Sequence, residues 1–313
     1  MERLDGSSAV PPPFRGGVVA LGNFDGFHLG HQAVVGRAIA HARAEGRPAI
    51  VATFDPHPMR FFRPDSPWFR LTSLDQRQRL FEAAGADAML VFPFDAKLAA
   101  LTAEEFAAQQ LVESIGAGGV VTGTDFTFGK GRSGNVSDLG RFGAEMGFAV
   151  ETVQPVRLHG ETVSSTRIRD FLRTGRPHEA AELLTRPFAI EGVVQPGAKL
   201  GRELGFPTAN LSMSNYLRPA YGIYAVRGRL ADGRRLDGVA SLGVRPTFDP
   251  PQELLEPYFF DFSGDLYGQT IEVALIDYLR PEAKFDSLDA LKAQIAADAD
   301  QARAVLSRGH WNG

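Results

Sequence analysis

Between residues 17 and 185, short apolar runs alternate with amphipathic stretches. The apolar runs are nearly continuous, as in parallel strands buried on both faces, and the stretches between them have helical spacing. This alternation predicts an α/β domain with a doubly wound parallel sheet, whose ligand lies at the carboxyl ends of the strands. The predicted strands cover 17–21, 49–54, 88–92, 119–122 and 149–153, and the predicted helices cover 30–44, 74–84, 103–115 and 137–146.

After residue 185 the apolar runs follow one another without helical stretches, and Gly or Pro interrupts the gaps. This pattern predicts a compact antiparallel barrel or sandwich that ends in one amphipathic helix. Predicted strands cover 188–194, 222–230, 235–242, 255–262 and 270–278, and the final helix covers 287–306. Two short predicted helices, 167–173 and 177–184, come just before this part. Arg186-Pro187 marks the expected boundary, so we predict a flexible tail at 1–15, one domain at 16–185 and a second at 186–313.

Composition is that of a globular protein, because 44% of the 313 residues are hydrophobic and 22% are charged. The absence of cysteine excludes disulfides, thiolate nucleophiles and cysteine metal sites. The first residues are acidic and proline-rich where a signal peptide needs a basic start and an apolar stretch, and no apolar run reaches the length of a membrane span. We therefore expect a cytoplasmic protein with no membrane partner.

The net charge of −4 divides evenly, with 19 basic and 21 acidic residues up to residue 185 and 14 basic and 16 acidic residues after it. Binding of DNA or RNA depends largely on clustered cations, which neither part provides. The charge pattern therefore predicts no nucleic-acid partner and leaves small phosphates open. It does not specify an oligomeric state.

The segment GNFDGFHLGHQ leaves the first predicted strand and enters the first predicted helix. A strand, a glycine-rich loop and a helix N-terminus together favour an anion such as phosphate. His28 and His31 would share one face of the first turn, and Gly30 lets a phosphate approach the backbone. No Walker lysine is present, so the imidazoles would stabilise the charge that develops during attack on phosphorus. The alternatives are a capping or core role, or a metal site with Asp25.

Three further segments carry candidate chemistry. In SSTRIR, Ser164 or Ser165 can cap the following helix, and Thr166 and Arg169 would then lie near its positive end, where pyrophosphate could bind. A surface helix is the alternative. TFDPHP at 53–58 and GTDFTFG at 123–129 are, on their own, typical of strand-ending loops and turns.

In the second part, GAKLGRELGFPTANL combines spaced glycines with Pro-Thr-Ala-Asn. The Thr208 hydroxyl and the Asn210 side-chain carbonyl offer neutral oxygens that suit Mg²⁺ already held by nucleotide phosphates. Read alone, the segment is also typical of a flexible hairpin loop.

HLGH resembles the HxGH signature of the nucleotidylyltransferase superfamily, and GNFDGFHLGH is similar to the form found in prokaryotic FAD synthetases. TFDPHP, GTDFTFG and SSTRIR also fit that family. The resemblance implies a Rossmann-like domain in which His28 and His31 are catalytic and Phe54 and His57 bind flavin. The nucleotide-binding residues that it implies are Gly22, Asn23, Phe24, Asp25, Gly26, Gly30, Asp125, Ser164, Ser165, Thr166 and Arg169.

GRELGFPTAN resembles the riboflavin kinase signature, and YGIYAV, GVASLGVRPTF and DLYGQTIEVALIDYLRPEAKF agree with it. The resemblance implies Mg²⁺ ligation by Thr208 and Asn210 and maps the catalytic glutamate onto Glu256, which would take the proton of the ribityl 5′-hydroxyl. Pro257 is expected to confine this point to an edge or a bulge, so Glu253 is the alternative base. The implied nucleotide-binding residues are Gly197, Lys199, Gly201, Arg202, Gly205, Pro207, Thr208 and Asn210.

Together the resemblances imply a bifunctional enzyme of flavin cofactor synthesis that requires Mg²⁺. ATP and riboflavin would give ADP and FMN, and ATP and FMN would then give pyrophosphate and FAD. One alternative is a nucleotidylyltransferase with another acceptor. A second is a flavin-binding regulator with one decayed site, although both histidines, PTAN and Glu256 are retained.

Overall fold

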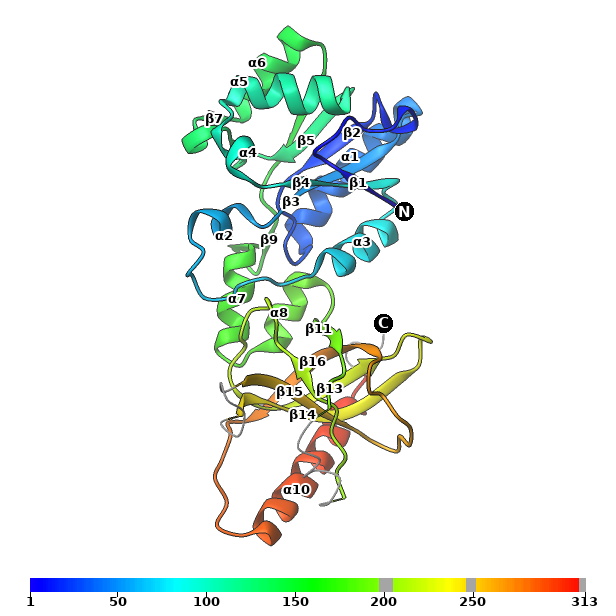
Figure 1. The fold of residues 1–313 in the computed structure, drawn as a ribbon, viewed down its shortest axis with the longest axis vertical. Coiled ribbons are helices and arrows are strands. Elements are labelled where there is room, and N and C mark those ends of the chain that lie inside the picture. Colours follow the sequence, from blue (N-terminus) through cyan, green and yellow to red (C-terminus); the bar gives the residue numbers. More distant parts are fainter. Residues whose placement is uncertain (197–204, 246–251, 310–313) are drawn as a thin grey trace. The chain divides into compact units, whose positions relative to one another are not determined.

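The computed structural model describes residues 1–196, 205–245 and 252–309. The chain forms two compact units (Figure 1). The first contains Met1–Pro67 and Leu74–Val163, and the second contains Trp68–Ser73 and Ser164–Gly313. No helix in these described stretches is long and apolar enough to cross a membrane.

The first unit is built on a parallel six-stranded sheet with the order β1-β4-β3-β2-β5-β8. The five predicted strands and the parallel pairing are confirmed. The strands are β1 (Glu2–Asp5), β2 (Val18–Leu21), β3 (Ala49–Asp55), β4 (Ala88–Pro93), β5 (Gly119–Gly123) and β8 (Ala149–Val153).

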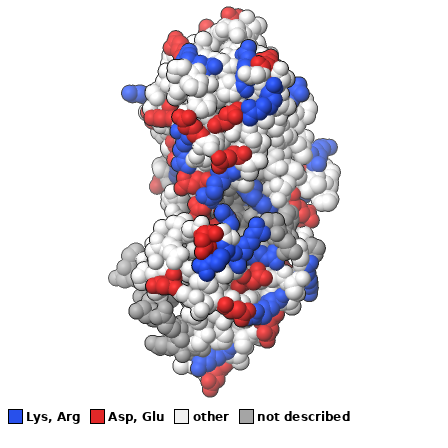
Figure 2. Space-filling view, turned by 90° about the vertical axis from the view of Figure 1, so that its right-hand side faces the viewer, with Lys and Arg blue, Asp and Glu red and all other residues white. Residues whose placement is uncertain are grey.

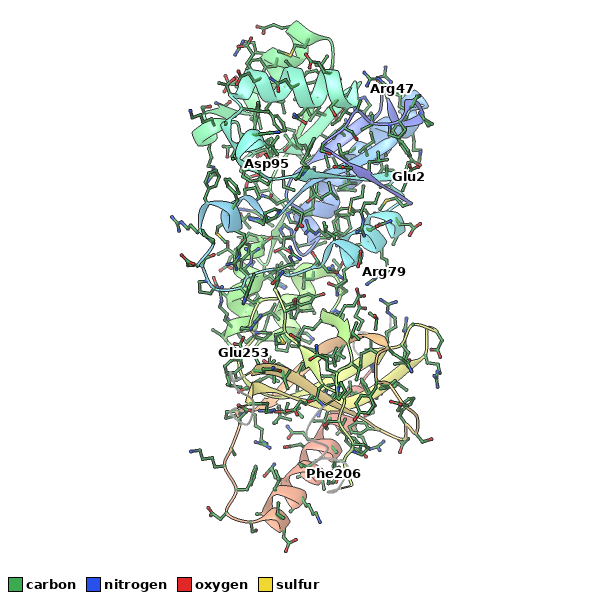
Figure 3. The ribbon with its side chains drawn as sticks, in the orientation of Figure 1. Glu2, Arg47, Arg79, Asp95, Phe206 and Glu253 are labelled. Atoms are coloured by element: carbon green, nitrogen blue, oxygen red, sulfur yellow. The ribbon has the colours of Figure 1, made fainter. Side chains whose placement is uncertain are left out.

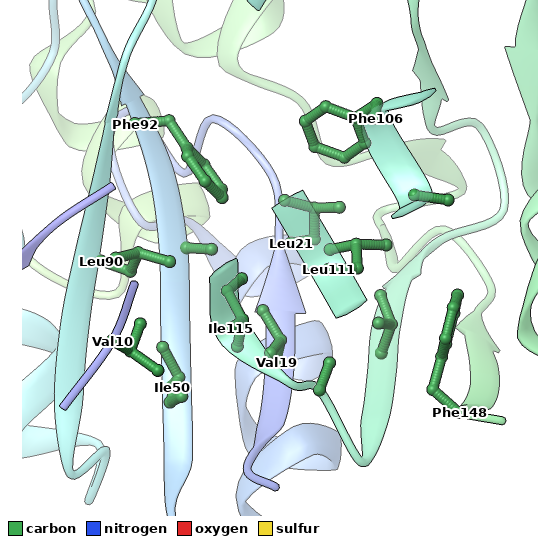
Figure 4. Close-up of a cluster of buried hydrophobic side chains, with 14 of the residues drawn as sticks. Val10, Val19, Leu21, Ile50, Leu90, Phe92, Phe106, Leu111, Ile115 and Phe148 are labelled. Carbon is green, nitrogen blue, oxygen red and sulfur yellow. The ribbon is translucent and has the colours of Figure 1, made fainter. Parts of the chain in front are cut away.

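Both faces of the central strands β2, β3 and β5 are buried, as expected when helices cover each side. In β2, Val19 and Leu21 join one apolar cluster, whereas Val18 and Ala20 join the other. Figure 4 shows the first cluster, where Leu111 and Ile115 pack over the strands. The helices are α1 (Leu29–Glu45), α2 (Pro58–Phe62), α3 (Leu74–Ala83), α4 (Ala96–Ala100), α5 (Ala103–Phe106), the π-helix η2 (Ala107–Ile115) and α6 (Val136–Met146).

The beginning of the chain differs from the prediction. Residues 1–15 do not form a flexible tail, because β1 pairs in parallel with β4 and the 3-10 helix η1 (Pro12–Phe14) follows. Leu4 is buried, and Arg3 pairs with Asp75 of α3 at 2.5 Å. A four-residue edge strand with one inward apolar side chain has too little periodicity to be recognised in the sequence.

Several small elements were also absent from the prediction. The helix predicted over 103–115 begins as α5 and continues as the π-helix η2. The helices α2 and α4 have five residues each, which is too short for a 3.6-residue pattern to be visible. The remaining short elements are the hairpin strands β6 (Thr127–Phe128) and β7 (Gly134–Asn135), the 3-10 helix η3 (Lys130–Arg132), and the strands β9 (Arg157–Leu158) and β10 (Glu161–Thr162).

The second unit is a nearly closed antiparallel barrel with the strand order β11-β16-β13-β14-β15-β12. Gln195 and Asn210 form a bridge that links the ends of β11 and β12. The predicted barrel and its final helix are confirmed, and α10 packs Ala299, Ala302 and Leu306 against the strands. The elements are β11 (Phe188–Val193), β12 (Leu211–Ser212), β13 (Gly222–Arg229), β14 (Arg235–Arg245), β15 (Gln252–Phe259), β16 (Thr270–Arg280) and α10 (Leu288–Leu306).

Two helices that precede residue 186 belong to this second unit: α7 (Ser165–Arg173) and α8 (Pro177–Leu184). α8 contacts β11 and β16, and its Leu183 and Leu184 are buried. The Ala220 amide also donates to the Leu172 carbonyl at 2.9 Å. The barrel is therefore packed against residues on the N-terminal side of the predicted boundary.

We predict that the second half alone, residues 186–313, phosphorylates riboflavin with Mg-ATP. A fragment starting at Ser164 should be the more stable of the two, with a Tm higher by roughly 5 °C or more, because it keeps the buried side chains of α8. Circular dichroism measures both melting curves, and chromatography measures FMN. A folded 186–313 fragment without kinase activity would contradict the assignment of this activity to the second half.

Candidate functional sites

The loops that carry the N-terminal motifs leave the same edge of the parallel sheet. β2 lies between β3 and β5, and the chain passes from β2 to β3 on one side and later returns to β5 on the other. Ligands of open α/β sheets bind at such a switch point, beyond the carboxyl ends of the strands. The segments 22–28, 55–57 and 123–126 all follow these strand ends.

The loop between β2 and α1 has an unusual backbone that aromatic packing holds in place. Phe24, Gly26 and Phe27 have φ angles of 49°, 89° and 44°. This left-handed region is costly for a bulky side chain and is common at functional sites. Both Phe rings are buried and pack edge-on against Phe81, with ring centroids 5.9 and 5.0 Å apart. The packing fixes the course of the loop into the helix N-terminus.

Buried side chains of β3 and α3 hold the same loop by hydrogen bonds. The Thr53 hydroxyl donates to the Asn23 carbonyl at 2.8 Å, and Nη1 of Arg77 donates to the Thr53 hydroxyl at 2.9 Å and to the Asn23 carbonyl at 3.2 Å. Within the described parts of the chain, the buried Oδ1 atom of Asn23 has no hydrogen-bond partner. Such an atom points to a donor on a ligand. Arg77 was missed in the sequence because it lies in α3, far from any motif.

The two histidines stand at the first turn of α1, as predicted. His28 is the N-cap, and its Nδ1 accepts a hydrogen bond from the backbone amide of His31 at 3.4 Å. With Nδ1 as the acceptor, a proton on the neutral ring is assigned to Nε2. The rings are stacked with centroids 3.6 Å apart and an interplanar angle of 19°, and His28 is buried. The capping alternative is therefore correct for Nδ1.

Gly30 leaves room for this arrangement. A Cβ atom at position 30 would lie 3.2 Å from Cε1 of His28, so a larger residue would press on the ring. Asp25 is buried in the same loop. Among the described residues, which include Asp25, His28 and His31, no group of three His, Cys, Asp or Glu side chains is placed to hold a metal ion. The structure therefore does not support the alternative of a metal site here.

Aromatic side chains gather around the loop after β3, where a flavin site was predicted. Phe54 is buried, with its ring stacked on Phe92 and edge-on to Phe94. Two aromatic residues of α2 that the sequence reasoning missed extend this group, since Phe61 and Phe62 both pack edge-on against Phe94. Phe62 is 63% exposed and offers a free ring face that the buried Phe54 does not.

The other predicted residues of this unit have local roles. His57 is the N-cap of α2, where its Nδ1 accepts from the Met59 amide at 3.1 Å. Asp125 is exposed in the turn after β5, and its carboxylate folds over Gly123, where a Cβ would lie 2.8 Å from Oδ1. Gly22 lies beside the Phe24 ring, and a Cβ atom at position 22 would lie 3.0 Å from Cζ of Phe24. These contacts shape the loops around the strand ends.

The SSTRIR segment begins α7 in the second unit. Ser164, one of the two predicted caps, is the N-cap and accepts from the Arg167 amide at 3.3 Å. Ser165 and Thr166 open the helix. Arg169 donates through Nε to the Phe69 carbonyl at 2.8 Å, and its guanidinium lies over the Phe69 ring. Since the histidine loop belongs to the first unit, a shared pocket of these two segments stays a prediction.

In the barrel, the register places Asn210 and Glu256 on one face, which Thr208, two residues before Asn210, would share in an extended segment. Leu211 of β12 pairs with Leu255 of β15, and the Ala209 amide donates to the Pro257 carbonyl at 2.9 Å. Continuing this register by one residue puts Asn210 opposite Glu256, and cross-strand neighbours share a face. Asn210 is buried.

Pro257 does not interrupt the ladder between β14 and β15. That ladder runs without a bulge from Gly238↔Phe259 to Arg245↔Gln252. Of the two expected settings, an edge or a bulge, Pro257 therefore has the edge, because β12 on its other side covers only Leu211–Ser212. The Pro257 carbonyl points toward Ala209. An amide N–H at position 257 would point to the same side of β15, toward the segment just before the two-residue strand β12. The proline removes a bond only where the partner strand has ended, and the aim of Glu256 is undisturbed.

The two candidate bases have different partners. Glu256 pairs with Arg245 of β14. Glu253, labelled in Figure 3, accepts from Nε of Arg218 at 2.7 Å and from the Tyr221 hydroxyl. Burial raises the pKa of Glu253, but these hydrogen bonds outweigh it and hold the pKa below its ordinary value. The same contact and burial raise the pKa of Tyr221 to about 12.

The glycine-rich part of the kinase motif is described only in part. Gly197, Lys199, Gly201 and Arg202 lie outside the described residues. Gly205 has a φ of 89°, which suits glycine. Pro207 and Thr208 line a pocket together with Val194, Ala209, Pro257, Phe259, Phe262, Gly264, Asp265, Leu266 and Tyr267.

Comparisons with known proteins cover both units. A family model described as FAD synthetase matches residues 11–167, and one described as riboflavin kinase matches residues 184–306. The chain is 40% identical to the bifunctional riboflavin kinase/FMN adenylyltransferase of Pseudomonas fluorescens, covering 98% of each chain. It is also 40% identical to the protein of that name from Escherichia coli strain K12, covering 93% of each.

The chain belongs to the bifunctional riboflavin kinase/FMN adenylyltransferase family. This confirms the resemblance that the HLGH and PTAN segments indicated. A solved structure titled as a macrolide-efflux protein from Streptococcus pneumoniae has the same fold, with a TM-score of 0.86, 33% identity, and coverage of 97% of this chain and 99% of that chain. The fold of the family thus spans both units.

Membership in this family does not by itself assign the site residues. The histidine pair and the capped segment of α7 lie at helix starts, Glu256 lies on strand β15, and Thr208 and Asn210 lie just before strand β12.

Proposed function

We propose that the two units catalyse consecutive steps, with riboflavin and ATP giving FMN and ADP in the barrel, and FMN and ATP giving FAD and pyrophosphate at the parallel sheet. The observation that carries the proposal is the presence of both family domains in one chain, each with its motif residues on the expected elements. Purified protein with riboflavin and Mg-ATP should yield FMN and then FAD on a chromatogram. A flavin-binding regulator would bind flavin and form neither product.

In the adenylyltransferase reaction, an FMN phosphate oxygen attacks the α-phosphorus of ATP, the new O–P bond forms and the bond to pyrophosphate breaks. In this proposal the positive end of α1 and Nε2–H of its N-cap residue His28 stabilise the charge on the α-phosphate. His31 stacks on His28 and completes the pair. No side chain needs to act as a nucleophile. We assign the leaving pyrophosphate to Ser165, Thr166 and Arg169 and the flavin ring to Phe54, His57 and Phe62.

In the kinase reaction, the ribityl 5′-hydroxyl attacks the γ-phosphorus of ATP, and ADP leaves. Glu256 accepts the hydroxyl proton, because it lies on the face that carries Thr208 and Asn210. The two neutral oxygens of Thr208 and Asn210 fit Mg²⁺, which prefers hard oxygen ligands and keeps phosphate oxygens in its shell. When bound, Mg²⁺ neutralises charge on the nucleotide phosphates.

The proposed partners are small molecules alone: riboflavin, FMN and ATP. On the face shown in Figure 2, Lys and Arg are interspersed with Asp and Glu in both the upper and the lower part of the view. Such a mixture lacks the continuous basic surface that long nucleic acids require. A cytoplasmic location without membrane or nucleic-acid partners remains part of this proposal.

Thr208→Ala and Asn210→Ala should each abolish FMN formation and leave FAD formation from supplied FMN nearly intact. The reason is that both side chains position metal and phosphates at the kinase site alone. Chromatographic assays of the two half-reactions measure this, and Ser212→Ala in the adjoining strand β12 is the matched control. Equal loss of both activities in Thr208→Ala would contradict the separate assignment.

A further inference from the structure

An arginine of β14 holds the proposed base of the kinase reaction by one oxygen. Ser241 and Arg245 lie on one face of β14, and Glu256 is the cross-strand partner of Ser241. Arg245 donates through Nε to Oε2 of Glu256, through Nη2 to the Ser241 hydroxyl at 2.6 Å, and through Nη1 to Oε1 of Glu282 at 2.8 Å. All three guanidinium nitrogens are engaged, which fixes the orientation of the planar group.

A glycine makes this arrangement possible. Gly243 lies between Ser241 and Arg245 on the same face, and a Cβ atom there would lie 2.3 Å from Oε1 and 2.4 Å from Oε2 of Glu282. Glycine in a strand interior costs stability and marks a close approach. The Glu282 carboxylate, which follows β16, therefore reaches Arg245 only because residue 243 has no side chain.

The anchoring leaves half of the Glu256 carboxylate available. Oε2 is bound to Arg245, and no donor from the described residues contacts Oε1. Glu282 shares the cation, so the positive charge of Arg245 is divided between two carboxylates. Those charges and hydrogen bonds, acting against burial, raise the pKa of Arg245, so the cation persists. One oxygen is thus fixed and the other can accept a proton.

We propose that Arg245 is a positioning residue of the kinase reaction, which holds Glu256 through Oε2 so that Oε1 faces the substrate hydroxyl, with Glu282 bracing the guanidinium through the gap at Gly243. This inference rests on the proposed role of Glu256 as the base. In this role Arg245 acts on the reaction only through Glu256, unlike a residue that binds the nucleotide phosphates directly.

The test is a double-mutant cycle in the full-length protein. Arg245→Gln and Arg245→Lys are made in the native sequence and in Glu256→Gln, and kcat and KM for riboflavin are measured with Mg-ATP. The circular dichroism melting curve of each variant reports folding of the barrel, and FAD formation from FMN in the same preparations reports the other unit. Arg229→Gln is the matched control, because the pair of Arg229 with Glu272, at 2.8 Å, also joins two barrel strands.

In the native sequence, Arg245→Gln should lower the kinase kcat roughly 10- to 100-fold, because misplacing a reacting group by about 1 Å costs about that much. KM should stay within about threefold, since the substrate contacts remain. Lysine should not restore kcat, because it lacks the planar fork. In Glu256→Gln the further loss should be below about twofold, because the two residues act as one unit. Arg229→Gln should have no effect on kcat.

Gly243→Ala and Glu282→Gln test the brace and should lower kcat roughly threefold to tenfold, within the range of pairwise couplings. They also keep the inference testable if Arg245→Gln fails to fold. Full activity in Arg245→Lys, an equal loss in both backgrounds, or parallel loss of FAD formation would overturn the positioning role. A loss below about tenfold in Glu256→Gln alone would instead refute the proposed base. A large loss of kinase kcat in Glu256→Gln, together with a native kcat in Arg245→Gln, would refute only the positioning role of Arg245.

Discussion

Replacing His28 or His31 by alanine is expected to lower turnover in FAD formation about 10²- to 10³-fold while the dissociation constants of ATP and FMN change little. The reason is that a preorganised donor at a helix N-terminus stabilises charge that is present only in the transition state. Removing one such donor costs about this factor. Steady-state kinetics at saturating ATP, together with ligand titrations, separate the two effects. Riboflavin kinase activity in the same samples should survive.

His28→Asn provides the matched control for the helix cap. Alanine at this position removes both the cap and the Nε2 donor, whereas asparagine is a good N-cap and keeps the bond from the His31 amide. If Nε2 is the catalytic donor, His28→Asn should be as slow as His28→Ala and should melt at a higher temperature. Recovery of activity in His28→Asn would mean that His28 serves only as a cap.

Two further variants test the electrostatic role. Lysine at either position should not restore activity, because a charge on a long stem cannot reproduce a donor held at the first turn. The double alanine variant should lose less than the product of the single losses, since both rings serve one developing charge. Variants with weakened ATP binding and unchanged turnover at saturation would show that the pair only grips the ground-state phosphate, and the catalytic role would be wrong.

The architecture could be predicted because both units carry strong periodic signals. Continuous apolar runs identified the buried parallel strands, and β2 supplies side chains to both core clusters, as those runs require. The signals failed where elements were short or polar. β1 has one buried side chain, Leu4, and α2 has five residues, so neither gives a pattern longer than chance.

The candidate sites could be predicted only where a motif is contiguous. His28 and His31 lie in one turn of the chain, and the sequence placed them correctly. Arg77 and Arg245 reach their partners across the fold, from α3 to the loop after β2 and along β14 to β15. Such contacts depend on register and packing, and nothing next to these arginines in the sequence indicates them. The expected disturbance by Pro257 failed for the same reason, because it depends on where β12 ends.

Glu256→Gln is expected to lower the rate of FMN formation roughly 100-fold or more, because glutamine keeps the shape of the side chain but cannot accept the ribityl proton. FAD formation from supplied FMN should be unchanged. Initial rates at saturating riboflavin and Mg-ATP measure the kinase step.

Glu253→Gln is the control, three residues earlier on the same strand. Its carboxylate is already occupied by Arg218 and Tyr221, and these hydrogen bonds hold its pKa below the ordinary value, which makes it the weaker proton acceptor. Glu253→Gln should therefore retain a kinase rate within about threefold of the native protein, in contrast to the loss expected for a positioned base. A loss below about tenfold in Glu256→Gln, combined with a large loss in Glu253→Gln, would transfer the role of the base to Glu253. The anchoring of Glu256 by Arg245 argues for the opposite result, since Glu256 keeps one oxygen clear on the face that carries Thr208 and Asn210.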